Sequence, residues 1–139
     1  MFERFSERGR RAVYFSWHEA SDLRCPQITT EHSLLGILRE DKAVAGRLGG
    51  GAEAAIRQEL ERLAPPNRAK IPTPGDLPLS EETKRALVVA IEEAEALQHQ
   101  TVDTAHIVLG LLRVEECNAA KLLRKNGINY QQYRIDVAI

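Results

Sequence analysis

The stretch "TTEHSLLGILRE", residues 29–40, recurs further along the chain as "DTAHIVLGLLRV", residues 103–114. A constant offset of 74 positions separates identical residues in the two copies: His32 and His106, Gly36 and Gly110, Arg39 and Arg113. The same offset relates residues 5–48 to residues 79–122 without a gap, and 15 of these 44 positions are identical. Unrelated helices that share only an apolar rhythm would not match so often. The sequence therefore indicates a tandem duplication.

Length and charge limit the class of protein. The 139 residues suffice for one domain, 1–139, but not for an ATPase motor as well. A formal net charge of −1 gives no broad basic field for nucleic-acid binding. No stretch approaches the roughly 20 apolar residues of a membrane span, and "MFERFSERGRR" is charged where a signal peptide is apolar. We therefore predict a cytoplasmic protein that binds neither nucleic acid nor membrane.

Apolar residues at three- and four-residue steps predict helices and no strands. Ser6 is expected to cap a first helix that ends near Leu23, and Thr30 a second helix that ends near Arg39. Further helices are predicted over 43–48, 52–63, 80–97, 104–113, 117–125 and 130–137. The predicted fold is thus all-α, with two pseudo-symmetric four-helix repeats and eight helices in a single domain.

A proline-rich stretch divides the two repeats. Residues 64–78 carry five of the six prolines of the chain and are predicted to be neither helix nor central strand. The expected organisation is repeat one over about 5–63, a linker over 64–78 and repeat two over about 79–138.

Several residues within the repeats have a structural interpretation. Glycine inside a helix costs about 1 kcal/mol relative to alanine, so its presence in both copies predicts a close approach by a neighbouring helix. His32 and His106, in the first turns of their helices, are expected to be buried capping residues. His18 and Glu19 lack the second histidine of a zinc-binding helix, so "HEASD" is predicted to be a helix surface.

No pattern predicts catalysis or a bound cofactor. The histidines are accompanied by no nucleophile–base pair, no metal-ligand spacing and no phosphate-binding glycine loop. Cys25 and Cys117 are not equivalent in the repeat and belong to no CxxC pair, so both are expected to be ordinary reduced cysteines. We predict a protein without enzymatic activity, metal or cofactor.

The duplicated phrases, together with "MFERFSERGRRAV" and "LSEETKRALVVAIEEAEALQHQTVDTAHIVLGLLR", closely resemble the N-terminal domain of ClpC/ClpA-type AAA+ unfoldases, the double Clp-N repeat. The resemblance covers roughly residues 1–138. It implies a non-catalytic domain, monomeric in isolation, that receives protein substrates and adaptor proteins for a Clp ATPase and its protease. Because no GxxxxGK[ST] motif is present, the chain is either an excised domain or a free-standing regulatory protein that docks on a Clp ring or its protease.

The resemblance to ClpC-type domains further implies recognition of arginine-phosphorylated proteins. A phosphoarginine needs an anion site beside a carboxylate, and a helix N-terminus can bind its phosphate. The corresponding candidates in repeat one are Ser6, Thr30, Glu31 and His32. In repeat two Ser80, Thr104 and His106 remain, but Ala105 replaces the glutamate, so this second site is predicted to be degenerate. The alternative for Glu31 is a purely structural role in the helix dipole.

Aromatic residues near the N-terminus are candidates for protein contacts. Phe2 and Phe5 are predicted to belong to an adaptor-binding surface. Tyr14, Phe15 and Trp17 are expected to be either core residues or an exposed docking patch.

Overall fold

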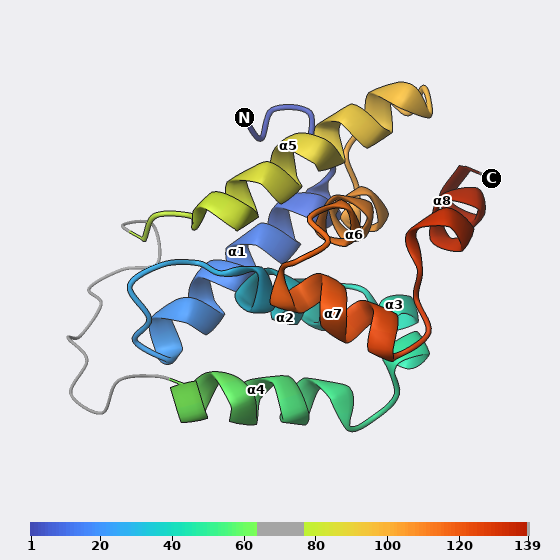
Figure 1. Ribbon diagram of the computed structural model, residues 1–139. Helices are drawn as coiled ribbons and strands as arrows, with labels where there is room; N and C mark the ends of the chain where they lie inside the picture. Colours follow the sequence, from blue (N-terminus) through green and yellow to red (C-terminus); the bar gives the residue numbers. More distant parts are fainter. Residues whose placement is uncertain (64–76, 139) are drawn as a thin grey trace.

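The computed structural model describes residues 1–63 and 77–138, and within them the chain is helical and contains no β-strand. The predicted all-α fold is thus confirmed. No helix of this part is long and apolar enough to cross a bilayer. The linker predicted over 64–78 lies outside the described residues except for positions 77 and 78. The helices are α1 (Glu7–Asp22), α2 (Thr30–Glu40), α3 (Lys42–Leu48), α4 (Ala52–Leu63), α5 (Glu81–Ala96), α6 (Thr104–Arg113), α7 (Asn118–Lys125) and α8 (Tyr130–Ala138) (Figure 1).

The long first helices of the two repeats, α1 and α5, begin and end alike. Ser6, as predicted, and Ser80 are their N-caps, and each hydroxyl oxygen accepts a hydrogen bond from an amide one turn later, at 3.0 and 3.2 Å. Such a cap satisfies an otherwise unpaired amide and contributes about 1 kcal/mol. Beyond the other end, Arg24 and Gln98 both have positive φ, 54° and 60°. The duplicated sequence therefore produces a duplicated backbone.

Two glycines allow the first two helices of each repeat to cross at very short distance. A Cβ on Gly36 would lie 2.2 Å from the carbonyl oxygen of Ala12, and a Cβ on Gly110 would lie 2.1 Å from that of Ala86. Real Cβ atoms do not come within 3.0 Å of backbone atoms, so only hydrogen fits at these positions. The predicted close approach is confirmed in both copies, for α1 on α2 and for α5 on α6.

The repeats are joined by an exchange of the segments that precede their first helices. The Ser6 amide donates to the Val102 carbonyl, just before α6, at 2.9 Å. The Ser80 amide donates to the Ile28 carbonyl, just before α2, at 3.0 Å. An isolated parallel bridge accompanies each contact. Each repeat thus donates a backbone amide to a carbonyl group of the other repeat that, among the described residues, has no partner within its own repeat.

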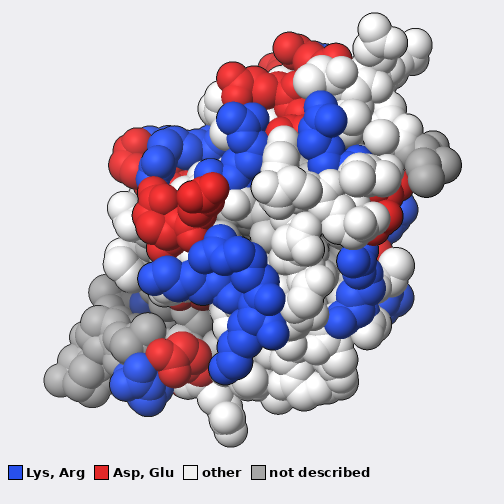
Figure 2. Space-filling view, turned by 45° about the vertical axis from the view of Figure 1, so that its right-hand side comes forward, with Lys and Arg blue, Asp and Glu red and all other residues white. Residues whose placement is uncertain are grey.

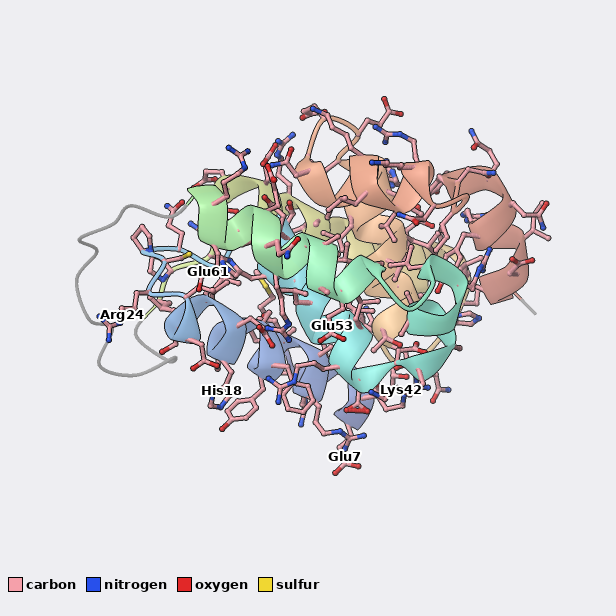
Figure 3. All side chains as sticks on the ribbon, turned by 90° about the horizontal axis from the view of Figure 1, so that it is seen from below. Glu7, His18, Arg24, Lys42, Glu53 and Glu61 are labelled. Carbon is pink, nitrogen blue, oxygen red and sulfur yellow. The ribbon has the colours of Figure 1, made fainter. Side chains whose placement is uncertain are left out.

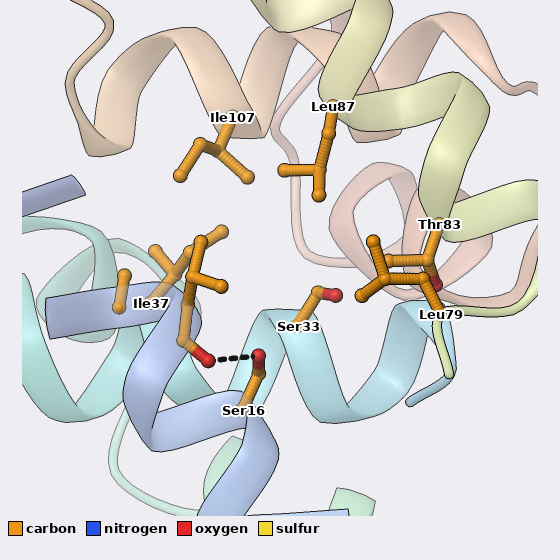
Figure 4. Close-up of a pocket in the computed structure, with 9 residues that line it drawn as sticks. Ser16, Ser33, Ile37, Leu79, Thr83, Leu87 and Ile107 are labelled. Atoms are coloured by element: carbon orange, nitrogen blue, oxygen red, sulfur yellow. Dashed lines mark hydrogen bonds between the residues drawn. The ribbon is translucent and has the colours of Figure 1, made fainter. Parts of the chain in front are cut away.

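Tightly packed side chains fill the interface between the repeats. Ser16 and Ile37 of repeat one and Leu87 and Ile107 of repeat two line the small cavity that remains there (Figure 4). Its volume is about 10 Å³, roughly the room that one water molecule needs. This cavity between the repeats therefore has no space for a ligand larger than water.

A buried glutamate ties α4 to the first two helices. Glu19 on α1 is 2% exposed, and its carboxylate accepts hydrogen bonds from Arg39 of α2 at 3.2 Å and from Arg57 of α4 at 2.8 Å. Seen from below, α4 lies beside α1 and passes in front of α2 (Figure 3). The prediction that "HEASD" is a helix surface is wrong for Glu19, because two guanidinium groups compensate its buried charge. The counterpart Glu93 is also 2% exposed and is held by arginines of α6 and α8.

The helix crossing can be tested by comparing a glycine at the crossing with a helical glycine that has open space around it. Gly36→Ala should lower the free energy of unfolding by roughly 1–3 kcal/mol, because the new methyl group forces α2 away from α1. Gly46→Ala, in α3, is the matched control: its Cβ would meet nothing within 4 Å. That variant should be neutral or stabilised by up to about 1 kcal/mol. Urea unfolding followed by circular dichroism measures both, and equal stabilities would contradict the crossing.

Candidate functional site

The head of α2, residues 28–32, is organised by a capping box. Thr29, not Thr30, is the N-cap: its backbone is extended, and its hydroxyl oxygen accepts the His32 amide. The sequence prediction was off by one residue because Thr30 is already helical and its hydroxyl donates to Glu31 at 3.2 Å. His32 is fully buried, and its Nδ1 accepts the Thr29 amide at 2.9 Å. Its expected role as a buried capping residue is confirmed.

The structure separates residues that the sequence assigned to one site. Ser6 was expected to join Glu31, but its hydroxyl donates to Asp103 of repeat two at 3.1 Å. The serine whose backbone pairs beside the head of α2 is Ser80, through its bond to Ile28. The exchange between the repeats causes this regrouping. Thr30, Glu31 and His32 therefore lie with Ser80, whereas Ser6 lies with the head of α6, residues 102–106.

Glu31 places its carboxylate at the edge of a groove between α4 and α7. The side chain is largely buried, at 8% exposure, and one oxygen accepts the side-chain amide of Asn118 at 3.0 Å. The groove has a volume of about 400 Å³. Its floor is apolar, its α7 wall carries two ammonium groups, and its α4 wall carries a second carboxylate; these lining residues are Ala55, Ile56, Leu122, Lys121, Lys125 and Glu59.

The two lysines of this wall were not singled out by the sequence. Within the described part of the chain, neither Lys121 nor Lys125 has a carboxylate within 4.0 Å. Basic side chains gather over α7 in the middle of the face shown in Figure 2. The signal in the sequence was their spacing of four residues on a short helix, which places both on one face. The groove thus combines two carboxylates, those of Glu31 and Glu59, with two ammonium groups and an apolar floor.

The head of α6 differs because a carboxylate already occupies its N-terminus. Asp103 is the N-cap, and its Oδ1 accepts the Thr104 amide at 2.8 Å as well as the Ser6 hydroxyl. Arg8 lies 3.8 Å from the other oxygen of Asp103 and 3.0 Å from Asp41, which also accepts the Thr104 hydroxyl. Ala105, half-buried, offers no polar atom on its side chain. A phosphate at the head of α6 would be repelled by the carboxylates of Asp103 and Asp41.

A histidine pair distinguishes the second head further. His106 Nδ1 accepts the Asp103 amide at 2.9 Å, so its proton is on Nε2, which lies 2.7 Å from Nδ1 of His99. The residue at the equivalent place in repeat one is Cys25, and the Nε2 of His32 has no hydrogen-bond partner among the described atoms. Within those atoms, no group of three or more histidine, cysteine or acidic side chains could hold a metal ion.

The aromatic residues of the N-terminus are mostly packed. Phe5 is 3% exposed and belongs to the core, so it cannot contribute to an adaptor surface while the domain is folded. Phe2 packs edge-on against it and is half-buried. Of the three bulky residues on α1, only Tyr14 is clearly exposed, at 50%. Phe15 lies under the Arg39 guanidinium, and Trp17 is partly buried against the core.

Comparison with known sequences supplies the family. The profile of the family described as "Clp repeat (R) N-terminal domain" matches residues 4–126. The chain is 34% identical over 141 residues to "Negative regulator of genetic competence ClpC/MecB" of Bacillus subtilis (strain 168), covering 99% of this chain and 17% of that protein. It is 32% identical over 143 residues to the chloroplastic chaperone ClpD of Arabidopsis thaliana, covering 93% of this chain and 15% of that protein. The chain thus spans about one sixth of the length of these curated relatives.

Solved structures agree with the sequence comparison. The N-terminal domain of ClpD from Arabidopsis thaliana superimposes with a TM-score of 0.75 at 31% identity, covering 97% of this chain and 92% of that one. The Hsp104 N-terminal domain of Candida albicans gives the same TM-score of 0.75 at 17% identity, covering 96% and 88%. The second likeness is one of fold alone.

The buried capping histidine predicts a pH dependence of stability. Burial lowers the pKa of His32 to about 4, whereas a histidine in an unfolded chain titrates near 6.5. The unfolded state therefore binds more protons between these values, so the free energy of unfolding should fall as the pH drops from about 6.5 to 4. Urea unfolding at pH 7 and pH 5 measures this loss.

His32→Gln identifies the source of the effect. Glutamine at the third helical position can maintain the capping box but does not titrate, so the variant should lose less stability between pH 7 and pH 5 than the parent. His18→Gln, on the outer side of α1, should keep the parental pH dependence. The same loss in the parent and in His32→Gln would show that other groups are responsible.

Proposed function

The chain belongs to the Clp repeat N-terminal domain family, and from this membership we propose that it receives protein substrates and adaptor proteins for a Clp-type ATPase and its protease. A domain with this role binds proteins and leaves unfolding and proteolysis to other parts of the assembly. The tightly packed interface between its repeats supports surface binding, because a core cavity of about 10 Å³ admits no side chain of a partner.

We further propose that the groove beside Glu31 binds phosphorylated arginine. The observation that carries this proposal is the presence, along one groove, of the Glu31 carboxylate and of two ammonium groups that have no carboxylate within 4.0 Å among the described residues. A phosphoarginine presents a cationic, planar guanidinium beside an anionic phosphate. Glu31 would accept hydrogen bonds from the guanidinium, and Lys121, one turn of α7 beyond the Asn118 that contacts Glu31, would pair with the phosphate.

The surroundings of Glu31 favour a ligand over a purely structural role. A first-turn glutamate stabilises its helix through the dipole by roughly 0.3–1 kcal/mol, and this needs no burial. Glu31 is nevertheless largely buried, and its partners are the neutral Thr30 hydroxyl and Asn118 amide, not an arginine. By contrast, the buried Glu19 has two guanidinium partners. A guanidinium from a ligand would supply the cation that Glu31 lacks.

The same reasoning argues against a phosphoarginine site at the head of α6. Ala105 removes the carboxylate, and Asp103 carries a negative charge at the helix N-terminus, where a phosphate would otherwise bind. Arg8 already pairs with Asp41. We therefore propose one phosphoarginine site per chain, in the groove of repeat one, with Ser80, Thr104, Ala105 and His106 retained as parts of the scaffold.

Titration with free phosphoarginine, followed by backbone amide shifts in NMR, tests the proposal. We expect saturable shifts at residues 30–32 and 118–122, and none at residues 103–106. Unmodified arginine should shift the same amides at least tenfold more weakly, because it lacks the charge for Lys121. Shifts centred on residues 103–106, or no shifts at millimolar phosphoarginine, would refute it.

Glu31→Ala should abolish those shifts and reduce the free energy of unfolding by no more than about 1 kcal/mol. Glu7→Ala is the matched control, since Glu7 is also a first-turn glutamate but is 89% exposed on α1 (Figure 3). The control should bind phosphoarginine as the parent does. If both variants bind phosphoarginine equally well, the role of Glu31 is limited to stabilising α2.

A further inference from the structure

The groove beside Glu31 continues along α7 past the part that a phosphoarginine would fill. A second hollow of about 360 Å³ adjoins it and shares Ala55, Ile56, Leu122 and Lys125 with it. The second hollow ends at the turn of residues 49–51 between α3 and α4. The two hollows therefore form one surface trough, bounded by α4 on one side and by α7 on the other.

The trough has an apolar floor and a basic α7 wall, and the carboxylates of Glu31 and Glu59 line the other side of its first hollow. Ile56 is 3% exposed, and the half-buried Leu122 lies opposite it. Lys121 and Lys125 are exposed on the α7 wall, while the α4 wall in the second hollow consists of small alanine side chains. A partner that matches this surface has an apolar side chain for the floor and acidic side chains toward α7.

The glycine turn at the end of the trough leaves its backbone uncovered. A Cβ on Gly50 or on Gly51 would meet nothing within 4 Å, and only Gly49 has a positive φ, of 92°. Neither close packing nor backbone conformation therefore requires glycine at positions 50 and 51. Within the described part of the chain, the N–H and C=O groups of Gly50 make no hydrogen bond. An extended partner segment can pair with such open backbone groups.

We propose that this trough docks an extended, unmodified segment of a partner protein, with one apolar side chain on Ile56 and Leu122 and acidic residues facing Lys121 and Lys125. The segment passes the glycine turn, where its backbone pairs with Gly50. This goes beyond recognition of arginine phosphate, because no modified residue is needed. The domain then selects partners by an acidic–apolar–acidic pattern.

The experiment uses two unmodified fluorescein-labelled peptides in fluorescence anisotropy. One has the sequence Gly-Glu-Leu-Ala-Glu-Gly, and the other has lysine in place of both glutamates. The variant Lys121→Glu/Lys125→Glu should bind the acidic peptide roughly five- to tenfold more weakly than the parent, since two attractive contacts become repulsive. It should bind the lysine peptide more tightly than the parent does.

Lys42→Glu/Lys84→Glu changes the net charge equally at exposed positions outside the trough and should leave both affinities unchanged. The acidic peptide should also shift the amides of Gly50 and Gly51. Equal losses in the two double variants would mean that only net charge matters and would overturn the proposal. Concentration-dependent dimers that the Lys121→Glu/Lys125→Glu change dissolves would overturn it as well, because a second copy would then occupy the trough.

This test is separable from that of the phosphoarginine site. Binding of the acidic peptide with no response to free phosphoarginine would support the docking proposal and refute the phosphoarginine site. Amide shifts with free phosphoarginine but no binding of the acidic peptide would support the phosphoarginine site and overturn the docking proposal.

Discussion

The crossing of α1 over α2 at Gly36, repeated by α5 over α6 at Gly110, is the constraint on which the remaining geometry depends. Because only a hydrogen atom separates each pair of backbones, the second helix is held against the first without freedom to slide or tilt. This fixes the depth at which His32 is buried, and it presents Glu31 at the helix margin, within hydrogen-bond distance of α7. The groove between α4 and α7 is therefore a product of packing on the opposite side of α2.

Much of the fold could be predicted from the sequence because its signals are local. Helix ends follow from caps and periodicity, and the duplicated glycines indicated a duplicated contact. The partner of each helix head could not be predicted, because an offset of 74 residues is equally compatible with pairing inside a repeat and with exchange between repeats. The burial of Glu19 was missed because helical periodicity does not show which polar side chain is compensated by a distant partner: Arg57 lies on α4, 38 residues further along the chain.

The candidate site illustrates how two copies of one backbone acquire different chemistry. Thr29 and Asp103 cap equivalent helices, but the first is neutral and the second carries a charge that Ser6 and Thr104 stabilise. The groove lysines of α7 belong to repeat two, whereas Glu31 belongs to repeat one. Sequence reasoning confined to one repeat finds only half of such a site, because Glu31 and the lysines of α7 are ninety or more residues apart in the chain.

The exchange of segments between the repeats has a symmetry of its own. Phe5 pairs with Val102, and Ile28 pairs with Leu79; since 79 and 102 are the positions equivalent to 5 and 28, each partner offers the other the same patch. This is the isologous contact of a two-fold homodimer, made here within one polypeptide. A single repeat standing alone would expose that patch and would gain by pairing with another copy. The domain thus has the internal architecture of a dimer whose subunits share one gene, so that their association no longer depends on concentration and their sequences are free to diverge.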